Sequence, residues 1–237
     1  MAHQKVNETA LPDLDLVFVE GGSFTMGDNE SEYDFEKPAH RVEVSSFYIG
    51  QYPVTQRLWQ AVMGNNPSEF QGERRPVEQV SWDDTQFFIE KLNSETGKTF
   101  RLPTEAQWEY AARGGRYSQG YTYSGSDKLK QVGWYNENSN GETHDVGLLL
   151  ANELDIYDLS GNVWEWCEDD YHRNYAGALE DGSAWIDMPR GEGRVLRGGG
   201  YYFEAFGCRP TYRNGDHPGV CSSGVGFRLV LPCQSVG

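Results

Sequence analysis

Four cysteines and five histidines are the residues of this chain that could bind a soft metal ion or act in thiol chemistry. The cysteines are Cys167, Cys208, Cys221 and Cys233. They show neither CxxC spacing nor the spacing of a zinc site, and the histidines form no spaced ligand cluster. His40 and His144 are therefore interpreted as ordinary polar loop residues. Cys208 and Cys221 could pair across the loop between them, but the sequence leaves this open, and with it the redox compartment.

The segment between Arg197-Gly-Gly-Gly-Tyr and Gly226-Phe-Arg-Leu-Val has an unusual composition for its place near the end of the chain. It follows neither the alternation of a strand nor the three-to-four repeat of a helix, because Gly, Asn, Asp and Pro interrupt it. Aromatic rings nevertheless stand beside charged and hydroxyl groups throughout. Rigid rings with adaptable polar neighbours are typical of a binding surface, since they bury much area at low entropic cost. The alternative is a long loop whose rings fill the core, and the composition favours binding.

Composition and charge argue against several classes of partner and against a membrane-spanning chain. The formal net charge of −16 argues against binding of nucleic acid or of an anionic membrane through bulk electrostatics. No apolar run is long enough to span a membrane, and the polar N-terminus has no signal core. Either the protein is cytoplasmic or a targeting segment is absent from this sequence. The 28 glycines predict much turn-rich, irregular structure.

The sequence pattern predicts the strands and helices that must position this segment. We expect a flexible lead over residues 1–14, strands over 16–19, 23–27 and part of 41–49, and a tail over 234–237. Three helices are predicted to begin after Thr55, Ser81 and Thr104, the second ending near Gly97. Thr104 and Gln107 fit a capping box. With no internal repeat, the chain is predicted to be one α+β domain over residues 15–233 with large loop content.

An ordered series of short motifs then becomes specific as a set. In chain order it comprises Gly21-Gly-Ser-Phe-Thr-Met-Gly27, Pro53-Val-Thr55, Pro76-Val77, Val80-Ser-Trp82, Arg101-Leu-Pro-Thr-Glu-Ala-Gln-Trp-Glu109, Leu159-Ser-Gly-Asn-Val-Trp-Glu-Trp166, Arg197-Gly-Gly199 and Gly226-Phe-Arg228. The series resembles the formylglycine-generating-enzyme (sulfatase-modifying factor) family, over about residues 15–231. The resemblance implies a single-domain, loop-rich variant of the C-type lectin fold. Fold alone does not settle function.

Two enzymatic branches of that family fit this chain poorly. The oxidases bind copper through a pair of cysteine thiolates in the segment after Arg-Gly-Gly, and thiolates suit Cu(I). Here that segment holds Cys208, while Tyr202, Phe203 and Glu204 occupy the region of the partner. The iron-dependent sulfoxide synthases take metal histidines from an additional domain, which this sequence does not contain. We therefore expect neither copper nor iron, and no catalytic residues.

A third branch fits better, because the C-terminal segment resembles the variable region of proteins that retroelements diversify, in particular the surface-displayed variable protein of a spirochaete retroelement. Adenine-directed mutagenesis of the first two bases of AAC codons gives codons ending in C, which encode Tyr, Phe, Gly, Asp, His, Ser, Val, Cys or Pro among others, but never Lys, Glu, Gln, Met or Trp. The expected ligand-binding residues are Tyr202, Phe203, Glu204, Phe206, Gly207, Tyr212, Gly215, Asp216, His217, Val220, Ser222 and Ser223. All but Glu204 fall inside that codon set. The expected fixed frame is Arg197, Gly198, Gly199, Cys208, Arg209, Arg213, Pro218, Gly226, Phe227 and Arg228.

The resemblance also implies a structural Ca²⁺ site. The family holds this ion on the turn around Gly-Asn-x-Trp-Glu-Trp through two side chains and two backbone carbonyls. Carried over by position, the ligands are Asp158, Gly161, Val163 and Glu165. Hard oxygen ligands on a short turn suit Ca²⁺. The alternative is that the two carboxylates only hydrogen-bond the turn, while Trp164 and Trp166 of the same motif pack in the core.

These observations together predict a non-catalytic, receptor- or adhesin-like protein with a lectin-like scaffold and a variable ligand site over residues 197–228. The ligand would be a protein or a carbohydrate. The resemblance implies display at the cell surface, lipid-anchored through a segment absent from this sequence, with a cytoplasmic protein as the alternative. A family member with an unidentified enzymatic or accessory activity is the competing hypothesis, and a purely structural adhesion domain is a third.

Overall fold

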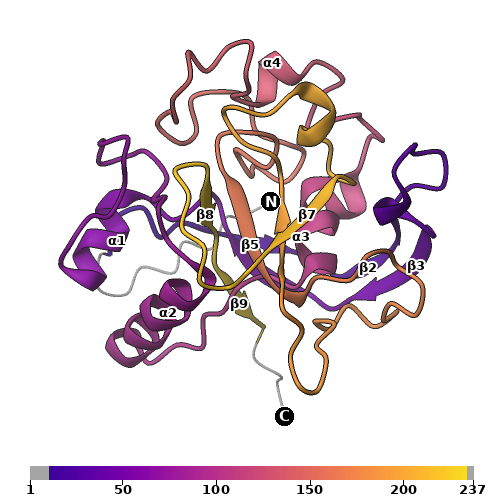
Figure 1. Ribbon diagram of the computed structural model, residues 1–237, viewed down its shortest axis with the longest axis horizontal. Coiled ribbons are helices and arrows are strands. Elements are labelled where there is room, and N and C mark those ends of the chain that lie inside the picture. The colour runs from indigo at the N-terminus through magenta and orange to yellow at the C-terminus, as the bar shows by residue number, and fades with distance from the viewer. Residues whose placement is uncertain (1–10, 234–237) are drawn as a thin grey trace.

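The structure, a computed structural model, describes residues 11–233, and its middle is a four-stranded sheet in the order β7-β6-β5-β8 (Figure 1). Its strands are β5 (Trp164–Asp170), β6 (Arg194–Arg197), β7 (Arg213–Asp216) and β8 (Val225–Phe227). β6 pairs antiparallel with β5 and β7, whereas β8 pairs parallel with β5. Three of these strands thus come from the C-terminal segment of interest or border it.

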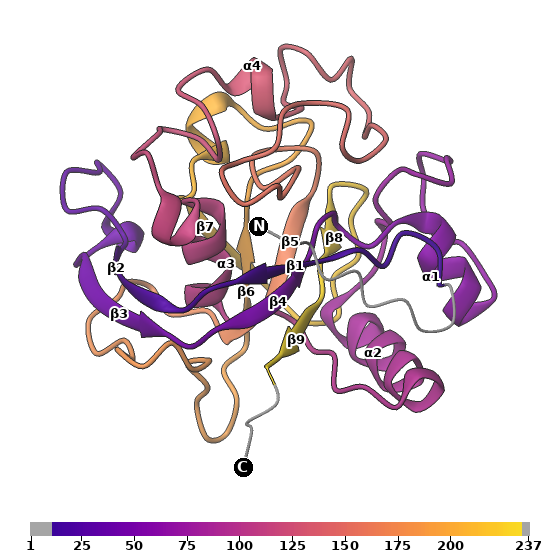
Figure 2. The ribbon, with the colours of Figure 1, turned by 180° about the vertical axis from the view of Figure 1, so that it is seen from behind.

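Two smaller sheets flank the central one (Figure 2). β1 (Leu16–Val19), β4 (Phe47–Gly50) and β9 (Val230–Pro232) form one antiparallel sheet, which brings the two ends of the domain together. β2 (Gly22–Met26) and β3 (His40–Val44) form a two-stranded ribbon. The expected strand within 41–49 is therefore two strands, because the chain changes sheets at Ser45 and Ser46; the Ser46 hydroxyl there accepts a hydrogen bond from the Gly21 N–H at 2.9 Å.

The helices lie around the sheets, with α1 and α2 on one side and the β2–β3 ribbon on the other (Figure 1). They are α1 (Gln56–Met63), α2 (Trp82–Thr96), α3 (Glu105–Ala112) and α4 (Leu129–Val132), with single 3₁₀ turns η1 (Asp34–Glu36), η2 (Gly115–Tyr117) and η3 (Ala205–Cys208). All three predicted caps are confirmed. Thr55 accepts from the Leu58 N–H, while Ser81 and Thr104 form capping boxes with Asp84 and Gln107.

The first helix is also the anchor for part of the expected flexible lead. Residues 1–10 lie outside the described residues, but Leu11 and Leu14 pack against the core. The Asp13 carboxylate pairs with Arg57 at 2.6 Å and Arg74 at 2.9 Å. Residues 11–14 are thus part of the folded domain, and the prediction of a flexible lead is wrong for them. The sequence missed this because both partners of Asp13 are distant in the chain.

The core confirms the predicted α+β class and the packing role of the motif tryptophans. Trp164 and Trp166 are both buried, in one cluster with Phe88 and Phe227. A second cluster joins Trp108 of α3 to the ribbon and to β4 and β6. No helix within residues 11–233 combines the length and apolar character that crossing a membrane requires.

Candidate ligand-binding surface

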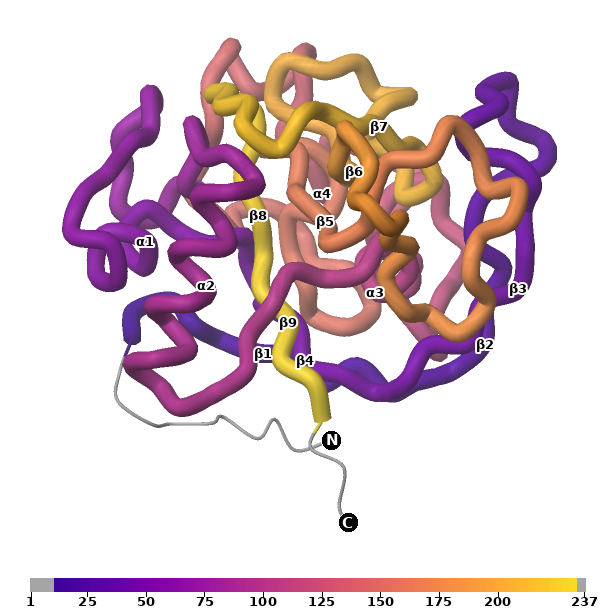
Figure 3. The backbone as a smooth tube through the Cα atoms, turned by 60° about the horizontal axis from the view of Figure 1, so that its bottom comes forward, coloured from indigo at the N-terminus to yellow at the C-terminus, as the bar shows by residue number. Residues whose placement is uncertain are grey.

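The predicted ligand-binding residues lie at one end of the molecule, on the loops around η3 and β7 (Figure 3). The exposed members are Tyr202, Glu204, Phe206, Asp216 and His217. The half-buried members are Phe203, Tyr212, Gly215, Val220, Ser222 and Ser223. Gly207 alone is buried, because the Phe203 ring lies 2.2 Å from where a Cβ would stand. Gly207 therefore supports the Phe203 ring, and the expectation that it contacts ligand is wrong.

The predicted frame residues are oriented inward instead. Among them, Arg197, Cys208, Phe227 and Arg228 have no exposed area, and Arg213 has 1%. Arg209 and Pro218 are half-buried, and the frame glycines are buried. The two sets alternate along one segment but separate in space. Most positions expected to vary reach the surface, and most positions expected to be fixed are buried.

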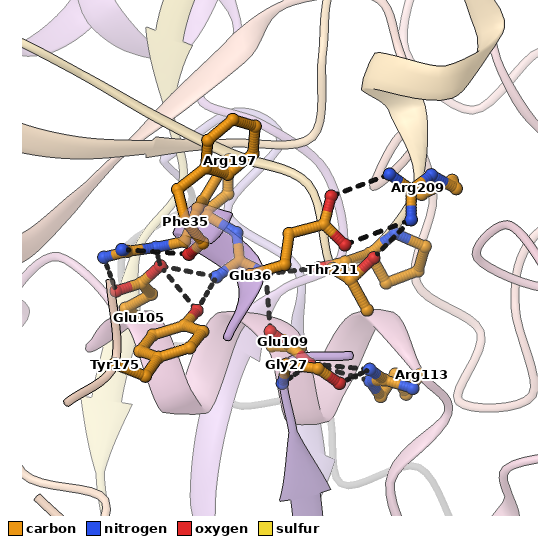
Figure 4. Close-up of polar contacts among 12 residues, drawn as sticks. Gly27, Phe35, Glu36, Glu105, Glu109, Arg113, Tyr175, Arg197, Arg209 and Thr211 are labelled. Carbon is orange, nitrogen blue, oxygen red and sulfur yellow. Dashed lines mark hydrogen bonds and ion pairs between the residues drawn. The ribbon is translucent and has the colours of Figure 1, made fainter. Parts of the chain in front are cut away.

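Two buried arginines of the frame meet α3 (Figure 4). Arg213 donates to both carboxylate oxygens of Glu105, at 2.6 and 2.8 Å. Arg197 donates to Glu105 and to Glu109, at 2.7 Å each, and also to the carbonyl of Pro210. Burial alone would raise the pKa of Glu105, but Arg213 and Arg197 hold it down to about 2. These buried ion pairs fix β6 and β7 against α3.

Arg213 and Arg197 also hold the loop backbone. Arg213 donates to the carbonyl of His172 at 2.7 Å, and Arg197 to that of Pro210, which precedes the half-buried Tyr212. A buried carbonyl that loses its donor costs free energy, so these bonds stabilise one loop conformation. The surface is therefore presented from a rigid base.

The aromatic residues of the surface form a continuous group that packs partly on the core. Phe203 meets Trp164 edge-on at 5.1 Å between ring centroids, and Tyr212 lies 6.1 Å from the same ring. Phe206 contacts both Phe203 at 6.1 Å and Tyr212 at 5.6 Å. Phe203 and Tyr212 thus contribute to packing as well as to the surface. Phe206 and Tyr202 are the more open rings, with 38% and 47% of their area exposed.

The sequence missed two further rings of this group, Tyr33 and Phe35. They lie on the loop before β3, which reads as a charged loop. Tyr33 stacks on Phe206 with ring centroids 5.9 Å apart, and Phe35 meets Tyr212 edge-on at 5.1 Å. No local pattern indicates a contact across more than 170 positions; the aromatic content of this loop was the one available signal.

On its other side the surface meets the loop between α1 and α2. The Gln79 N–H donates to the carbonyl of Ser222 at 2.9 Å, and the Phe70 ring meets Tyr201 edge-on at 5.3 Å. Glu78 of this loop is fully buried, and its Oε1 accepts from the Phe70 N–H at 2.8 Å while its Oε2 has no partner. Burial raises the pKa of Glu78 to about 6.

The cysteines are free thiols in this structure, and Cys208 and Cys221 do not form the disulfide that the sequence left open. Cys208 is buried, and burial raises the pKa of its thiol to about 12. Cys221 is exposed at the surface. The thiol of Cys208 is therefore protonated at neutral pH and is a poor metal ligand in this arrangement.

The residues expected to bind calcium share one turn at the start of β5, and their contacts describe a hydrogen-bonded turn. Asp158 is buried, accepts from the Gly147 N–H at 2.8 Å, and burial raises its pKa to about 6. Glu165 accepts from Arg228 at 2.6 and 2.7 Å. Gly161 donates its N–H to the Gly198 carbonyl, and Val163 is buried. Glu165 is thus neutralised by an arginine, and this donor set does not fit Ca²⁺ without rearrangement of that ion pair.

No other cluster supplies an obvious metal site. Within residues 11–233, no three His, Cys, Asp or Glu side chains are grouped so that they could hold an ion. The Ca²⁺ site consequently stays a prediction, with the Arg228–Glu165 pair as the contact that a bound ion must displace.

The chain is similar to known proteins in family, in sequence and in structure. The family described as the sulfatase-modifying factor enzyme 1-like domain matches residues 3–232. A chaperone protein, LppX of Paenibacillus barcinonensis, is 37% identical, over 79% of this chain and 78% of its own length. The inactive C-alpha-formylglycine-generating enzyme 2 of Bos taurus is 31% identical, over 88% of this chain and 66% of its own. The chain spans 37% of the length of another relative, the serine/threonine-protein kinase pkn1 of Chlamydia caviae, with 30% identity over 90% of this chain.

Two solved structures are similar over nearly the whole domain. Variable protein 1 of Treponema denticola superposes with a TM-score of 0.83 at 32% identity, over 92% of this chain and 95% of its own. PvdO from Pseudomonas aeruginosa gives a TM-score of 0.81 at 30% identity, over 92% and 94% of the two chains. The predicted fold is therefore confirmed, and so is the resemblance to a spirochaete variable protein.

Proposed function

This chain belongs to the sulfatase-modifying factor enzyme 1-like family, and we propose that it is a non-catalytic ligand-binding member whose residues 197–228 form a variable surface. The observation that carries the proposal is the separation of the two residue sets. Along one continuous segment, the predicted ligand-binding positions are exposed or half-buried apart from Gly207, while the frame positions between them are mostly buried and their arginines are ion-paired. Such a surface can change in sequence without changing the fold.

The similarity to a variable protein supports the same proposal, and the family includes an inactive member. The competing hypothesis is an enzymatic or accessory activity. Among residues 11–233 it has no supporting cluster of metal-binding side chains, and Cys208 is a buried, protonated thiol. The separation of the predicted ligand-binding positions from the buried frame therefore favours binding over catalysis.

The ligand class follows from the relatives only in part. One relative is named a chaperone protein, which favours a protein over a carbohydrate as ligand. Display at the cell surface belongs to the proposal as well, and labelling of intact source cells with an antibody tests it separately. Structural Ca²⁺ at the turn of Asp158 and Glu165 is proposed on the family resemblance alone.

A matched pair of displayed libraries tests the proposal. The first randomises five exposed positions and keeps the frame: Tyr202, Glu204, Phe206, Asp216 and His217. The second randomises five buried frame positions and keeps the surface: Arg197, Cys208, Arg213, Phe227 and Arg228. Protease resistance measures the folded fraction, and selection on immobilised hen lysozyme, as a defined protein target, measures binding.

We expect most members of the first library and few of the second to fold, because exposed substitutions cost little and buried charges cannot be removed singly. Specific lysozyme binders should come from the first library alone. Equal folded fractions in the two libraries would contradict the claim that the frame residues fix the fold. A folded first library without any lysozyme binder would contradict the binding function.

A further inference from the structure

The loop over residues 28–37 stands beside the variable segment and extends its aromatic surface (Figure 3). Tyr33 and Phe35 are half-buried and stack on each other with ring centroids 5.0 Å apart. Tyr33 also meets Tyr212 edge-on at 5.4 Å and stacks on Phe206 at 5.9 Å. These rings lie outside residues 197–228, so sequence change in the variable segment leaves them in place.

The frame residue Arg209 fixes this loop together with Glu109 of α3 and Arg113, as Figure 4 shows. Arg209 donates to both oxygens of the buried Glu36, at 2.7 and 3.1 Å. At the start of the loop, the Gly27 N–H donates to Glu109 at 3.0 Å, and Arg113 donates to the Gly27 carbonyl at 3.1 Å. Because none of these partners belongs to the exposed set, the course of the loop that carries the two rings is fixed independently of the exposed residues.

Exposed acidic residues adjoin the rings of this surface. Glu32, Asp34 and Glu204 neighbour its aromatic residues in the chain, and Asp216 acts electrostatically on Tyr202. Within residues 11–233, none of these four pairs with a basic side chain. The Arg209 guanidinium lies 6.0 Å from the ring centroids of Tyr33 and Tyr212, and its charge is balanced by the Glu36 carboxylate at 2.7 Å. The surface thus offers π faces and unpaired negative charge together.

We propose that Tyr33 and Phe35 form a constant wall of the ligand site, and that the site takes a lysine or arginine side chain of a protein beside an apolar group. The proposal rests on the proposed binding function and specifies its ligand. A cation above an aromatic face is attracted by the ring, and unpaired carboxylates add to that attraction. A neutral carbohydrate could stack on the same rings, but it would gain nothing from the four carboxylates.

A random peptide library displayed on phage, selected on the full chain, tests both parts. Selected peptides are measured against Tyr33→Ala and Phe35→Ala, with Phe18→Ala and Phe87→Ala as controls that remove exposed rings elsewhere. Loss of a central aromatic contact should weaken binding by about tenfold or more, whereas the controls should bind like the parent. The double variant Glu204→Gln, Asp216→Asn, whose side chains are exposed, should bind more weakly and with a smaller dependence on salt.

The outcomes separate the two proposals. Peptides rich in Lys or Arg that lose affinity to both wall variants support the inference. Peptides that depend on Phe206 and Tyr212 but not on Tyr33 or Phe35 would overturn the constant wall and leave the binding function standing.

Acidic or uncharged selected peptides would overturn the ligand class. The absence of any selected peptide would count against binding itself. Unchanged denaturant midpoints in the wall variants distinguish a lost contact from a lost fold.

Discussion

Replacement of Arg213 by alanine tests the buried frame most sharply. The guanidinium is 1% exposed and makes two bonds of 2.6 and 2.8 Å to Glu105, which is itself buried. Removal of one partner from a buried ion pair typically costs about 3–5 kcal/mol. Arg197 remains beside Glu105 at 2.7 Å, so we expect the lower half of that range. The cost is high because the guanidinium pairs with a buried carboxylate as well as with a loop carbonyl.

The assay is a urea denaturation series on single variants. With a slope of about 3 kcal/mol per M, a loss of about 3–4 kcal/mol lowers the midpoint by about 1 to 1.3 M. The matched surface variants Asp216→Ala and His217→Ala should move it by less than about 0.2 M, because exposed substitutions stay within about 0.5 kcal/mol. Phe203→Ala should fall between, since its ring packs on Trp164. Similar midpoints for Arg213→Ala and the surface variants would refute the reasoning.

Four further outcomes follow from the site. Incubation with copper, oxygen, reductant and a Cys-x-Pro-x-Arg peptide should give no aldehyde by mass spectrometry above a no-protein control; aldehyde formation would show an oxidase. If Ca²⁺ binds the native state at a hundred times its dissociation constant, it adds about 2.7 kcal/mol, so a chelator should lower the Tm by about 5–10 °C in the parent but not in Asp158→Ala. An equal response of the two proteins would place any calcium elsewhere. Glu78→Gln keeps the acceptor for Phe70 and removes the buried charge. The folded pKa of Glu78, about 6, lies above its ordinary value of 4.5. The contribution of the protonated Glu78 side chain to the stability of the folded protein is therefore fully present below pH 4.5 and is lost as the pH rises through 6. The variant should therefore be the more stable one at pH 7, by up to about 2 kcal/mol, with a flatter profile between pH 4.5 and 6; identical profiles would show that Glu78 does not titrate there. In the native protein, Cys221 should react with a maleimide while Cys167 and Cys208 stay protected, and rapid labelling of either buried thiol would contradict its burial.

The helix starts were predictable from sequence because a cap is a local interaction. Thr104 and Gln107 are three positions apart, and their reciprocal hydrogen bonds form as the pattern indicates. The frame could be outlined from sequence because the Arg-Gly-Gly and Gly-Phe-Arg motifs of the family bracket the segment, whereas the codon argument alone does not separate frame from surface, since its set includes Gly, Cys, Pro and Phe. The error at Gly207 arose because its codon fits the variable set, whereas its burial depends on the ring of Phe203.

The contacts that complete the site were beyond sequence reasoning because they join distant segments. Arg209 reaches Glu36 across 173 positions, and Arg213 reaches Glu105 across 108. Nothing local marks Glu36 or Glu105 as the partner of an arginine. For the same reason the stacking of Tyr33 on Phe206 could not be predicted.

Deep sequencing of codons 197–228 of this gene, across a population of source cells, tests the central claim most directly. Our account predicts substitutions concentrated at the exposed set, such as Tyr202, Phe206 and His217, with replacements limited to residues that derive from Asn codons. Arg197 and Arg213 should be invariant. A segment without variation, or with variation spread equally over exposed and buried positions, would contradict a diversified binding surface.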